Sequence, residues 1–504
     1  MASEPLIPIR GIALNTALSL STKIAGIVLG FFSLGLTTRF LGQAGFGVYS
    51  TVLAYASIVS FLGDFGLYSL MVREISRIES REEEGAIASN IFTMRIVGLV
   101  VFFALGIAFA PLLPHKGALP LFALFLASLQ YLALSIAQVL VAIFQKYLNI
   151  AFVAVAELAG RGLTLGALMV AITYTRQVSD ASRIALALTA FALGSLVIAV
   201  VSFWGTRRLV RLRLRVDFKA WKQLLAETLP MGIAVVVTAI YFRVDTILLA
   251  FLRSDAEVGI YNGAYRILDV LTFFPAAFVG LLMPRLSRYA VLDGKRFSNV
   301  FQGGFEALLM VTFPISAGLL LEAKPIVSFI AGKEFLASGL PLAILSGAVF
   351  MIFFGSLFSN ALIAKKQQWP LAYIYIFGMI VNIGANLFVI PRWGYVGAAW
   401  TTLLTEGLAT LLMLTVLWPI SVPWRRLASV LFSTALMALF LRIAQVPLAV
   451  AITGGAALYM AGLLLSGGLN KQDVAFILEP PIGGGKKSEY FGAADRRRKK
   501  ERTK

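Results

Sequence analysis

Long apolar runs separated by short polar segments make up most of the chain. An apolar helix of about 20 residues crosses the roughly 30 Å apolar core of a bilayer. The fragment Pro325–Ala331 is too short to span, and we expect it to form an interfacial or external turn. Runs of spanning length predict about fourteen helices, at 13–38, 47–70, 88–112, 118–142, 150–173, 183–204, 229–252, 261–283, 299–321, 338–363, 369–390, 396–419, 425–441 and 446–466.

The composition agrees with this pattern. Of the 504 residues, 59% are hydrophobic and 14% are charged, whereas soluble domains carry roughly 25% charged residues. A soluble fold is therefore excluded, and the sequence predicts an all-α polytopic membrane protein. The chain has no cysteine and one histidine, so it lacks thiolate and clustered imidazole ligands for a metal. We expect no cofactor.

The distribution of basic residues predicts the orientation of the helices. The formal net charge is +19, which in a soluble chain would suggest nucleic acid, but in a membrane protein basic residues collect in cytoplasmic loops. The termini and alternate loops carry thirty Lys and Arg, and the opposite loops carry nine. We therefore expect a multi-pass protein of the cell membrane with both termini cytoplasmic, and no nucleic-acid partner.

The longest internal loop, 206–228, separates two groups of six predicted helices. It carries seven basic residues and is interpreted as a cytoplasmic hinge between bundles. Phe218, Trp221, Leu224 and Leu225 share one helical face, which fits a short in-plane helix, and a solvated basic linker explains the loop equally well. The predicted domains are an N-terminal six-helix bundle at 1–205, the hinge at 206–228, a C-terminal six-helix bundle at 229–420, two additional helices at 421–468 and a basic, disordered cytoplasmic tail at 469–504.

A weak internal repeat supports this division. Shifting the chain against itself by 212 residues pairs Gly47 with Gly259 and Tyr49 with Tyr261, among six identities in 27 aligned positions. The shift covers six helices, which is an even number, so both halves enter the membrane from the same side. The two bundles therefore form a parallel repeat.

Eleven ionisable residues fall inside the predicted spans. At about 2.5–3.5 kcal/mol for each charge at a helix centre, exposing all of them to lipid would cost on the order of 30 kcal/mol. They must therefore pair with one another or face an aqueous interior. The eleven are Lys23, Asp64, Arg95, Glu157, Arg161, Arg243, Asp245, Arg266, Asp269, Glu306 and Glu406.

Helical spacing divides these charges into two groups. Glu157 and Arg161 are four residues apart and form a candidate structural pair, and Arg266 can reach Asp269 three residues on. The others have no opposite charge at that spacing and need partners elsewhere, either a salt bridge between helices or the substrate or a coupling ion. Candidate substrate contacts are Lys23, Arg95, Arg243 and Arg266; candidate cavity or coupling-ion acids are Asp64, Asp245, Asp269, Glu306 and Glu406.

Several short motifs resemble the polysaccharide-exporter branch of the multidrug/oligosaccharidyl-lipid/polysaccharide exporter superfamily. They cover helices one to twelve and consist of turn and small-residue packing signals. The motifs are TRFLG at 38–42, GFGVY at 45–49, FLGDFGL at 61–67, Arg73, VGIY at 258–261, Ile390-Pro391 and GYVGAAW at 394–400.

The resemblance implies two six-helix bundles, like those of multidrug and toxic compound extrusion (MATE) transporters, around a central cavity. It also implies alternating access that flips lipid-linked oligosaccharide to the outer leaflet. We expect this flipping to be secondary-active or gradient-assisted, with Na⁺ or H⁺ as the candidate coupling ions. Such substrates carry polyprenyl phosphate or pyrophosphate, to which basic side chains are complementary. Lys23 lies about 15 Å into the first helix, near the bilayer midplane. Membrane lipids and glycan polymerase or glycosyltransferase machinery are the expected partners.

Two alternatives remain open. An ion-coupled multidrug exporter is favoured if the acids Asp64, Asp245, Asp269 and Glu406 dominate the cavity. A membrane glycosyltransferase or polymerase would need catalytic groups on substantial external loops. The longest predicted external loop, 322–338, holds only two acids and two lysines, so the sequence favours a transporter over an enzyme.

Overall fold

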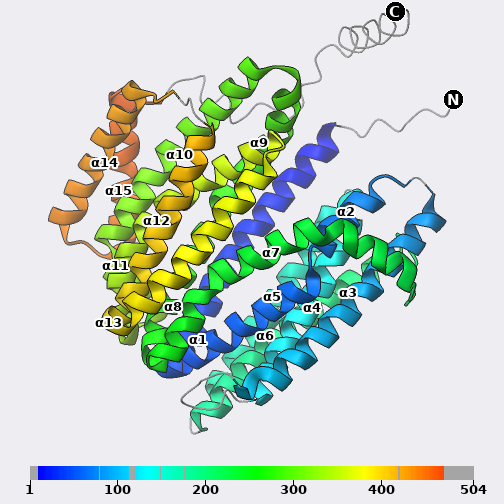
Figure 1. Ribbon diagram of the computed structural model, residues 1–504. Helices are drawn as coiled ribbons and strands as arrows, with labels where there is room; N and C mark the ends of the chain where they lie inside the picture. Colours follow the sequence, from blue (N-terminus) through cyan, green and yellow to red (C-terminus); the bar gives the residue numbers. More distant parts are fainter. Residues whose placement is uncertain are drawn as a thin grey trace, which may run out of the picture. The chain divides into compact units, whose positions relative to one another are not determined.

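The computed structural model describes residues 9–78, 80–112, 121–147, 149–174, 178–417 and 421–469. Side chains before Ala25, apart from that of Thr22, lie outside this description. The described ranges form helices and short connections without any strand, which confirms the predicted all-α class (Figure 1).

The helices follow one another with short connections. Two short 3₁₀ helices, η1 (Ala110–Leu112) and η2 (Lys333–Ser338), lie among them. The α-helices are α1 (Ile9–Asp64), α2 (Leu67–Ile75), α3 (Arg81–Phe109), α4 (Leu121–Lys146), α5 (Ile150–Tyr174), α6 (Asp180–Thr206), α7 (Phe218–Leu252), α8 (Asp255–Leu271), α9 (Phe273–Leu292), α10 (Gly294–Leu321), α11 (Ala323–Ala331), α12 (Gly339–Ala364), α13 (Gln368–Leu417), α14 (Trp424–Ala444) and α15 (Leu448–Leu465).

Within the described residues, twelve helical segments are long and apolar enough to cross a membrane. Two of them, Ala25–Ile75 with 51 residues and Gln368–Leu417 with 50, are more than twice as long as one crossing needs. Each is broken at a glycine with positive φ, Gly42 at 64° in α1 and Gly394 at 55° in α13, a conformation that side chains disfavour. Each break falls in the gap between two predicted spans, so the twelve candidate segments correspond to the fourteen predicted spans.

The chain divides into two compact units. The first contains the residues up to Leu271 together with Gly318–Met351 and Ala372–Leu411. The second contains Thr272–Ala317, Ile352–Leu371 and the residues from Leu412 on. The bundle boundaries predicted around the 206–228 hinge stay a prediction.

In the first unit, α1 and α8 meet backbone to backbone at two glycines. A methyl group added at Gly47 would overlap the carbonyl oxygen of Asp255, and one added at Gly259 would overlap that of Gln43. The two glycines are 212 residues apart, as are Gln43 and Asp255, so the contact follows the internal repeat. Only glycine permits so close an approach of two helices.

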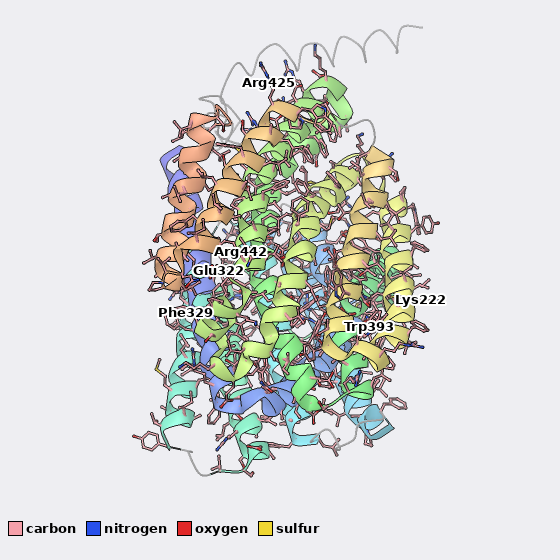
Figure 2. All side chains as sticks on the ribbon, turned by 90° about the vertical axis from the view of Figure 1, so that its left-hand side faces the viewer. Lys222, Glu322, Phe329, Trp393, Arg425 and Arg442 are labelled. Carbon is pink, nitrogen blue, oxygen red and sulfur yellow. The ribbon has the colours of Figure 1, made fainter. Side chains whose placement is uncertain are left out.

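Other elements of the first unit make contacts near the two ends of the part of α1 that runs from Gly42 to Asp64. Near the Gly42 break, the Arg39 guanidinium donates to the carbonyl of Phe329 on the nine-residue helix α11 at 2.6 Å; Phe329 is labelled in Figure 2. Beyond Asp64, the Arg73 guanidinium on α2 lies 2.5 Å from the Glu227 carboxylate on α7. Contacts of α1 and α2 with later elements thus occur near both ends of the part of α1 that follows Gly42.

In the second unit, α14 and α15 run side by side (Figure 1) and pack on α10. The hydroxyl of Tyr459 donates to the carbonyl of Met310 at 2.6 Å, and Arg426 lies 2.7 Å from Glu306. The two additional helices are therefore attached to α10 by polar as well as apolar contacts.

Candidate functional site

Ten of the eleven charges predicted inside the spans have described side chains. The exception is Lys23, which lies in α1 and whose side chain is outside the described residues. The structure brings several of the ten together in three clusters: a cationic cluster between α7 and α8, a buried acidic network between α7, α8 and α13, and an ion pair between α1 and α3.

The cationic cluster is built on one carboxylate. Asp269 on α8 lies 3.2 Å from the guanidinium of Arg243 on α7 and 3.7 Å from that of Arg266 on its own helix. The predicted local pair between Arg266 and Asp269 is therefore present, but Asp269 is shared with Arg243. Two guanidinium groups around one carboxylate leave a net positive charge.

The side chains of this cluster are neither fully buried nor exposed like surface residues, with 22–29% of their area accessible. Charged groups in a membrane span do not face lipid, so this accessible area points to an aqueous interior. Tyr265, one residue before Arg266, donates its hydroxyl to the carbonyl of Phe242 at 3.1 Å and ties α8 to α7 at this level. The arrangement is suited to bind an anion.

The acidic network surrounds Asp245, two residues after Arg243 on α7. Asn386 donates to one carboxylate oxygen at 2.6 Å. The hydroxyls of Tyr261 and Thr402 donate to the other at 3.1 and 2.8 Å. Asp245 is 3% exposed, and among the described side chains all three of its partners are uncharged. Neutral donors do not cancel the charge of a carboxylate, and burial disfavours an uncompensated charge, so this position is suited to take up a proton or a metal cation.

The network continues along α13. Asn386 also donates to Asn382 at 3.0 Å, and Asn382 lies 3.4 Å from the hydroxyl of Thr405. Glu406 follows on the same helix; it is buried and forms no ion pair with any described side chain. Carboxylate, hydroxyl and amide oxygens of this kind are ligands for hard cations.

Arg95 on α3 forms the third cluster. Its guanidinium lies 2.8 Å from the carboxylate of Asp64 on α1. The two groups form an ion pair, but the angles between them do not meet those of a hydrogen bond. Arg95 also donates to Ser135 at 2.7 Å and to Gln138 at 3.1 Å on α4. Only 2% of the Arg95 side chain is accessible. An arginine so enclosed is occupied by protein partners and holds three helices together.

The remaining candidates lie apart from these clusters. Glu306 pairs with Arg426 of α14 in the second unit. Arg161 on α5 donates to the carbonyl of Gly26 at 3.2 Å. Among the described side chains it forms no ion pair with Glu157, so the expected pair at this spacing is absent there.

None of the residues that hold Asp245 was predicted to contact it. Tyr261 stood out only in the internal repeat and the VGIY motif, and Thr402 is an ordinary residue of an apolar helix when only one helix is considered. Asn382 and Asn386 carried a usable signal, because two amides one helical turn apart in an otherwise apolar span are costly unless they face a polar partner.

The chain matches a known protein family. A family model described as polysaccharide biosynthesis protein matches residues 12–290, more than half of the chain. The chain belongs to this family. The resemblance to the polysaccharide exporters predicted from its motifs is thereby confirmed.

Two similar proteins carry transport names. The probable low-salt glycan biosynthesis flippase Agl15 of Haloferax volcanii is 22% identical over 392 residues, which cover 77% of this chain and 80% of that protein. A putative O-antigen transporter of Shigella dysenteriae is 25% identical over 396 residues, covering 77% and 96%. This polysaccharide biosynthesis family member thus matches most of the length of both.

Solved structures show the same fold. The lipid II flippase MurJ in an inward closed conformation aligns with a TM-score of 0.76 at 16% identity, covering 89% of this chain and 98% of that one. The MATE multidrug transporter DinF-BH aligns with a TM-score of 0.58 at 18% identity, covering 82% and 96%. The predicted MATE-like architecture of a multi-pass membrane protein is confirmed.

Proposed function

We propose that this family member flips a lipid-linked oligosaccharide from the cytoplasmic to the outer leaflet of the cell membrane. The observation that carries the proposal is the shared carboxylate of Asp269 between Arg243 and Arg266, which leaves excess positive charge inside membrane-spanning helices. The transport names of the two relatives and the MurJ-like fold support it.

The proposed substrate carries polyprenyl phosphate or pyrophosphate. Guanidinium groups bind phosphate through two parallel hydrogen bonds, and in a site that is only partly hydrated this attraction is stronger than in water. In the proposed bound state, Asp269 keeps one arginine while the phosphate takes the other, so the site never contains two unpaired cations. Lys23 is a proposed further contact from the first helix.

A cation gradient is the proposed energy source. Asp245 lies two residues from Arg243 on α7, so the two side chains leave the helix in different directions, one toward α8 and one toward the α13 network. Binding of Na⁺ or H⁺ at Asp245 would change how α7 packs on α13 and thereby shift Arg243. The two sites share one rigid helix, which is a short physical path for coupling.

Alternating access fits the contact of α1 with α8 and that of α2 with α7. In the proposed orientation, with both termini cytoplasmic, the contact of Gly47 with Gly259 closes the external end and the pair of Arg73 with Glu227 closes the cytoplasmic end. Opening one contact at a time would expose the cationic cluster to one side of the membrane. A glycan polymerase or glycosyltransferase acting outside would then use the delivered substrate.

An ion-coupled drug exporter is the second candidate, because the same fold is found in MATE transporters and the Asp245 network would serve such a protein equally well. The cluster of two arginines around one acid speaks against a cationic drug as cargo. No catalytic role is needed for either function.

The test compares substitutions in the cluster with a matched surface substitution. Arg266→Gln and Arg243→Gln should each reduce flipping of a fluorescent polyprenyl-pyrophosphate oligosaccharide in proteoliposomes at least tenfold, and Lys23→Gln should abolish it while Lys23→Arg retains part. Arg77→Gln, at an exposed position on the connection after α2, is the control for loss of one positive charge. Full flipping by an Arg243→Gln, Arg266→Gln double variant would disprove the site.

A further inference from the structure

The hinge is not a loose connection but a strap fixed along α3. We use the name strap for residues 207–222, which include the first turn of α7. Residues 210–217 form neither helix nor strand. The backbone N–H of Arg213 donates to the hydroxyl of Ser89 at 3.0 Å, and that of Arg215 donates to Thr93 at 2.9 Å.

The spacing of these two bonds has a simple geometric reason. Ser89 and Thr93 are four residues apart on a helix, which is about 6 Å along its axis. Arg213 and Arg215 are two residues apart in an extended segment, which is about 6.6 Å. The two repeats match, so alternate amides of the strap reach hydroxyls on successive turns of α3.

Apolar and aromatic contacts fix the strap further. Val210 is buried, and Leu212, Trp221 and Leu224 pack against the same cluster of α2, α3 and α4 side chains. The indole N–H of Trp221 donates to Asn90 at 2.6 Å. One face of the strap is therefore held by the protein, which fixes the direction of the opposite face.

The strap is strongly basic, and the side chains of all its basic residues are exposed. The strap carries seven basic residues, and within the described part of the chain none of them forms an ion pair: Arg207, Arg208, Arg211, Arg213, Arg215, Lys219 and Lys222. The two acids of the 206–228 segment are engaged elsewhere. Asp217 caps α7 by accepting from the N–H of Ala220 at 3.0 Å, and Glu227 pairs with Arg73.

Large apolar side chains alternate with these arginines and are exposed. Leu214 is 76% exposed, Val216 55% and Phe218 74%. These three residues continue the series of apolar residues at every second position that begins with Val210 and Leu212. Val210 and Leu212 pack on the apolar cluster, and the three later residues do not belong to it. Basic and apolar side chains exposed together are unfavourable in water but suit a bilayer interface, where apolar groups enter the acyl boundary and cations remain among headgroups.

The neighbouring helices put the strap at that level. The candidate spans on either side end at Thr206 and begin at Met231. The guanidinium of Arg207 lies 4.8 Å from the ring centre of Phe203, and that of Arg208 lies 5.6 Å from Trp204. Aromatic residues at the end of a span followed by cations are typical of the membrane interface. Lys222, labelled in Figure 2, lies where the strap becomes the beginning of helix α7.

We propose that the strap is a binding surface for anionic phospholipid headgroups of the cytoplasmic leaflet. Charge complementarity selects the partner: seven cations without an ion pair to any described side chain favour an anionic over a zwitterionic surface. Bound lipid would stabilise the strap in its position along α3, where the backbone N–H groups of Arg213 and Arg215 donate to Ser89 and Thr93. This inference depends on the cytoplasmic orientation of the loop but not on what the protein transports.

The test uses the absence of native cysteine. Leu214→Cys carries an environment-sensitive fluorophore, and the full-length protein is reconstituted in phosphatidylcholine vesicles with or without added phosphatidylglycerol. We expect a blue shift of emission that appears with phosphatidylglycerol, falls at high salt because the charges are screened, and is lost when Arg211, Arg213 and Arg215 are all changed to Gln. A label at Ser80→Cys, exposed before α3, should not respond.

Two results would overturn the proposal. The first is equal emission from the Leu214→Cys label in neutral and anionic vesicles, while the labelled protein and its triple Gln variant both elute intact in size-exclusion chromatography. This result would show that the strap does not recognise anionic lipid. A shift seen only when polyprenyl phosphate is added to neutral vesicles would assign the surface to loading of the transported lipid instead. Both arms use the same labelled protein, so its folding is controlled.

Discussion

The ion pair between Arg95 and Asp64 allows a quantitative test of whether a buried charge serves structure or transport. Their closest atoms are 2.8 Å apart, and the side chains are 2% and 12% accessible. At an effective dielectric constant of about 20, unit charges 4 Å apart attract by about 4 kcal/mol. Removing one partner of a buried pair leaves the other unpaired and costs about 3–5 kcal/mol.

We therefore expect Arg95→Gln and Asp64→Asn each to lower the free energy of unfolding by about 3–5 kcal/mol. The double variant leaves no unpaired charge, so it should be more stable than either single variant, with a coupling energy of at least about 2 kcal/mol. The assay is equilibrium unfolding in mixed micelles, followed by tryptophan fluorescence. The pair of Arg183 with Asp180, at 3.6 Å and with side chains 31% and 82% accessible, is the more solvent-accessible control and should couple by under about 1 kcal/mol.

Transport by the same double variant decides between the two roles. If Arg95 only joins α3 to α1 and α4, the double variant should flip substrate at close to the normal rate once it is folded. Additive effects of the two substitutions, to within about 0.5 kcal/mol, would refute the structural reasoning. A stable but inactive double variant would indicate that Arg95 contacts the substrate, as its position inside a span first suggested.

Two further predictions concern the coupling site and the glycine contact. Asp245→Asn should keep the shape of the network but remove its charge, so an imposed Na⁺ or pH gradient should no longer accelerate flipping in vesicles; an unchanged response would exclude Asp245 as the coupling acid. Gly47→Ala should separate α1 from α8 because its methyl group overlaps the Asp255 carbonyl, which costs about 1–3 kcal/mol and should lower both the thermal midpoint and the flipping rate. Gly45→Ala, whose methyl group would meet mainly the Leu41 side chain, should be tolerated, and equal effects of both substitutions would contradict the argument.

The hydrophobic pattern predicted the membrane class and the positions of the spans because burial in lipid depends on residue type alone. The breaks inside α1 and α13 fall in the predicted gaps between spans, because at Gly42 and Gly394 the backbone leaves helical geometry and two helices meet at a kink. A glycine between two apolar runs predicts such a break. The direction in which the chain continues after the break depends on what packs beside it, which the sequence does not give.

The candidate site was predictable only in part. Helical spacing placed Asp269 within reach of Arg266, because that contact lies within one helix. The contact of Asp269 with Arg243 joins two helices, and the neutral donors around Asp245 come from α8 and α13. Spacing along one chain contains no information on which helices become neighbours, and the neutral residues carry no charge to mark them.

The reciprocal contact at Gly47 and Gly259 has a consequence for the origin of the fold. Gly47 approaches Asp255 while Gly259 approaches Gln43, and each partner is displaced from the other by the same 212 residues. This is the contact that two identical subunits make across a two-fold axis, where one surface serves both. In an ancestral homodimer a single glycine would have satisfied both sides. If the chain arose by fusion of two such copies, Gln43 and Asp255 were then free to differ, while both glycines remain under the same steric limit.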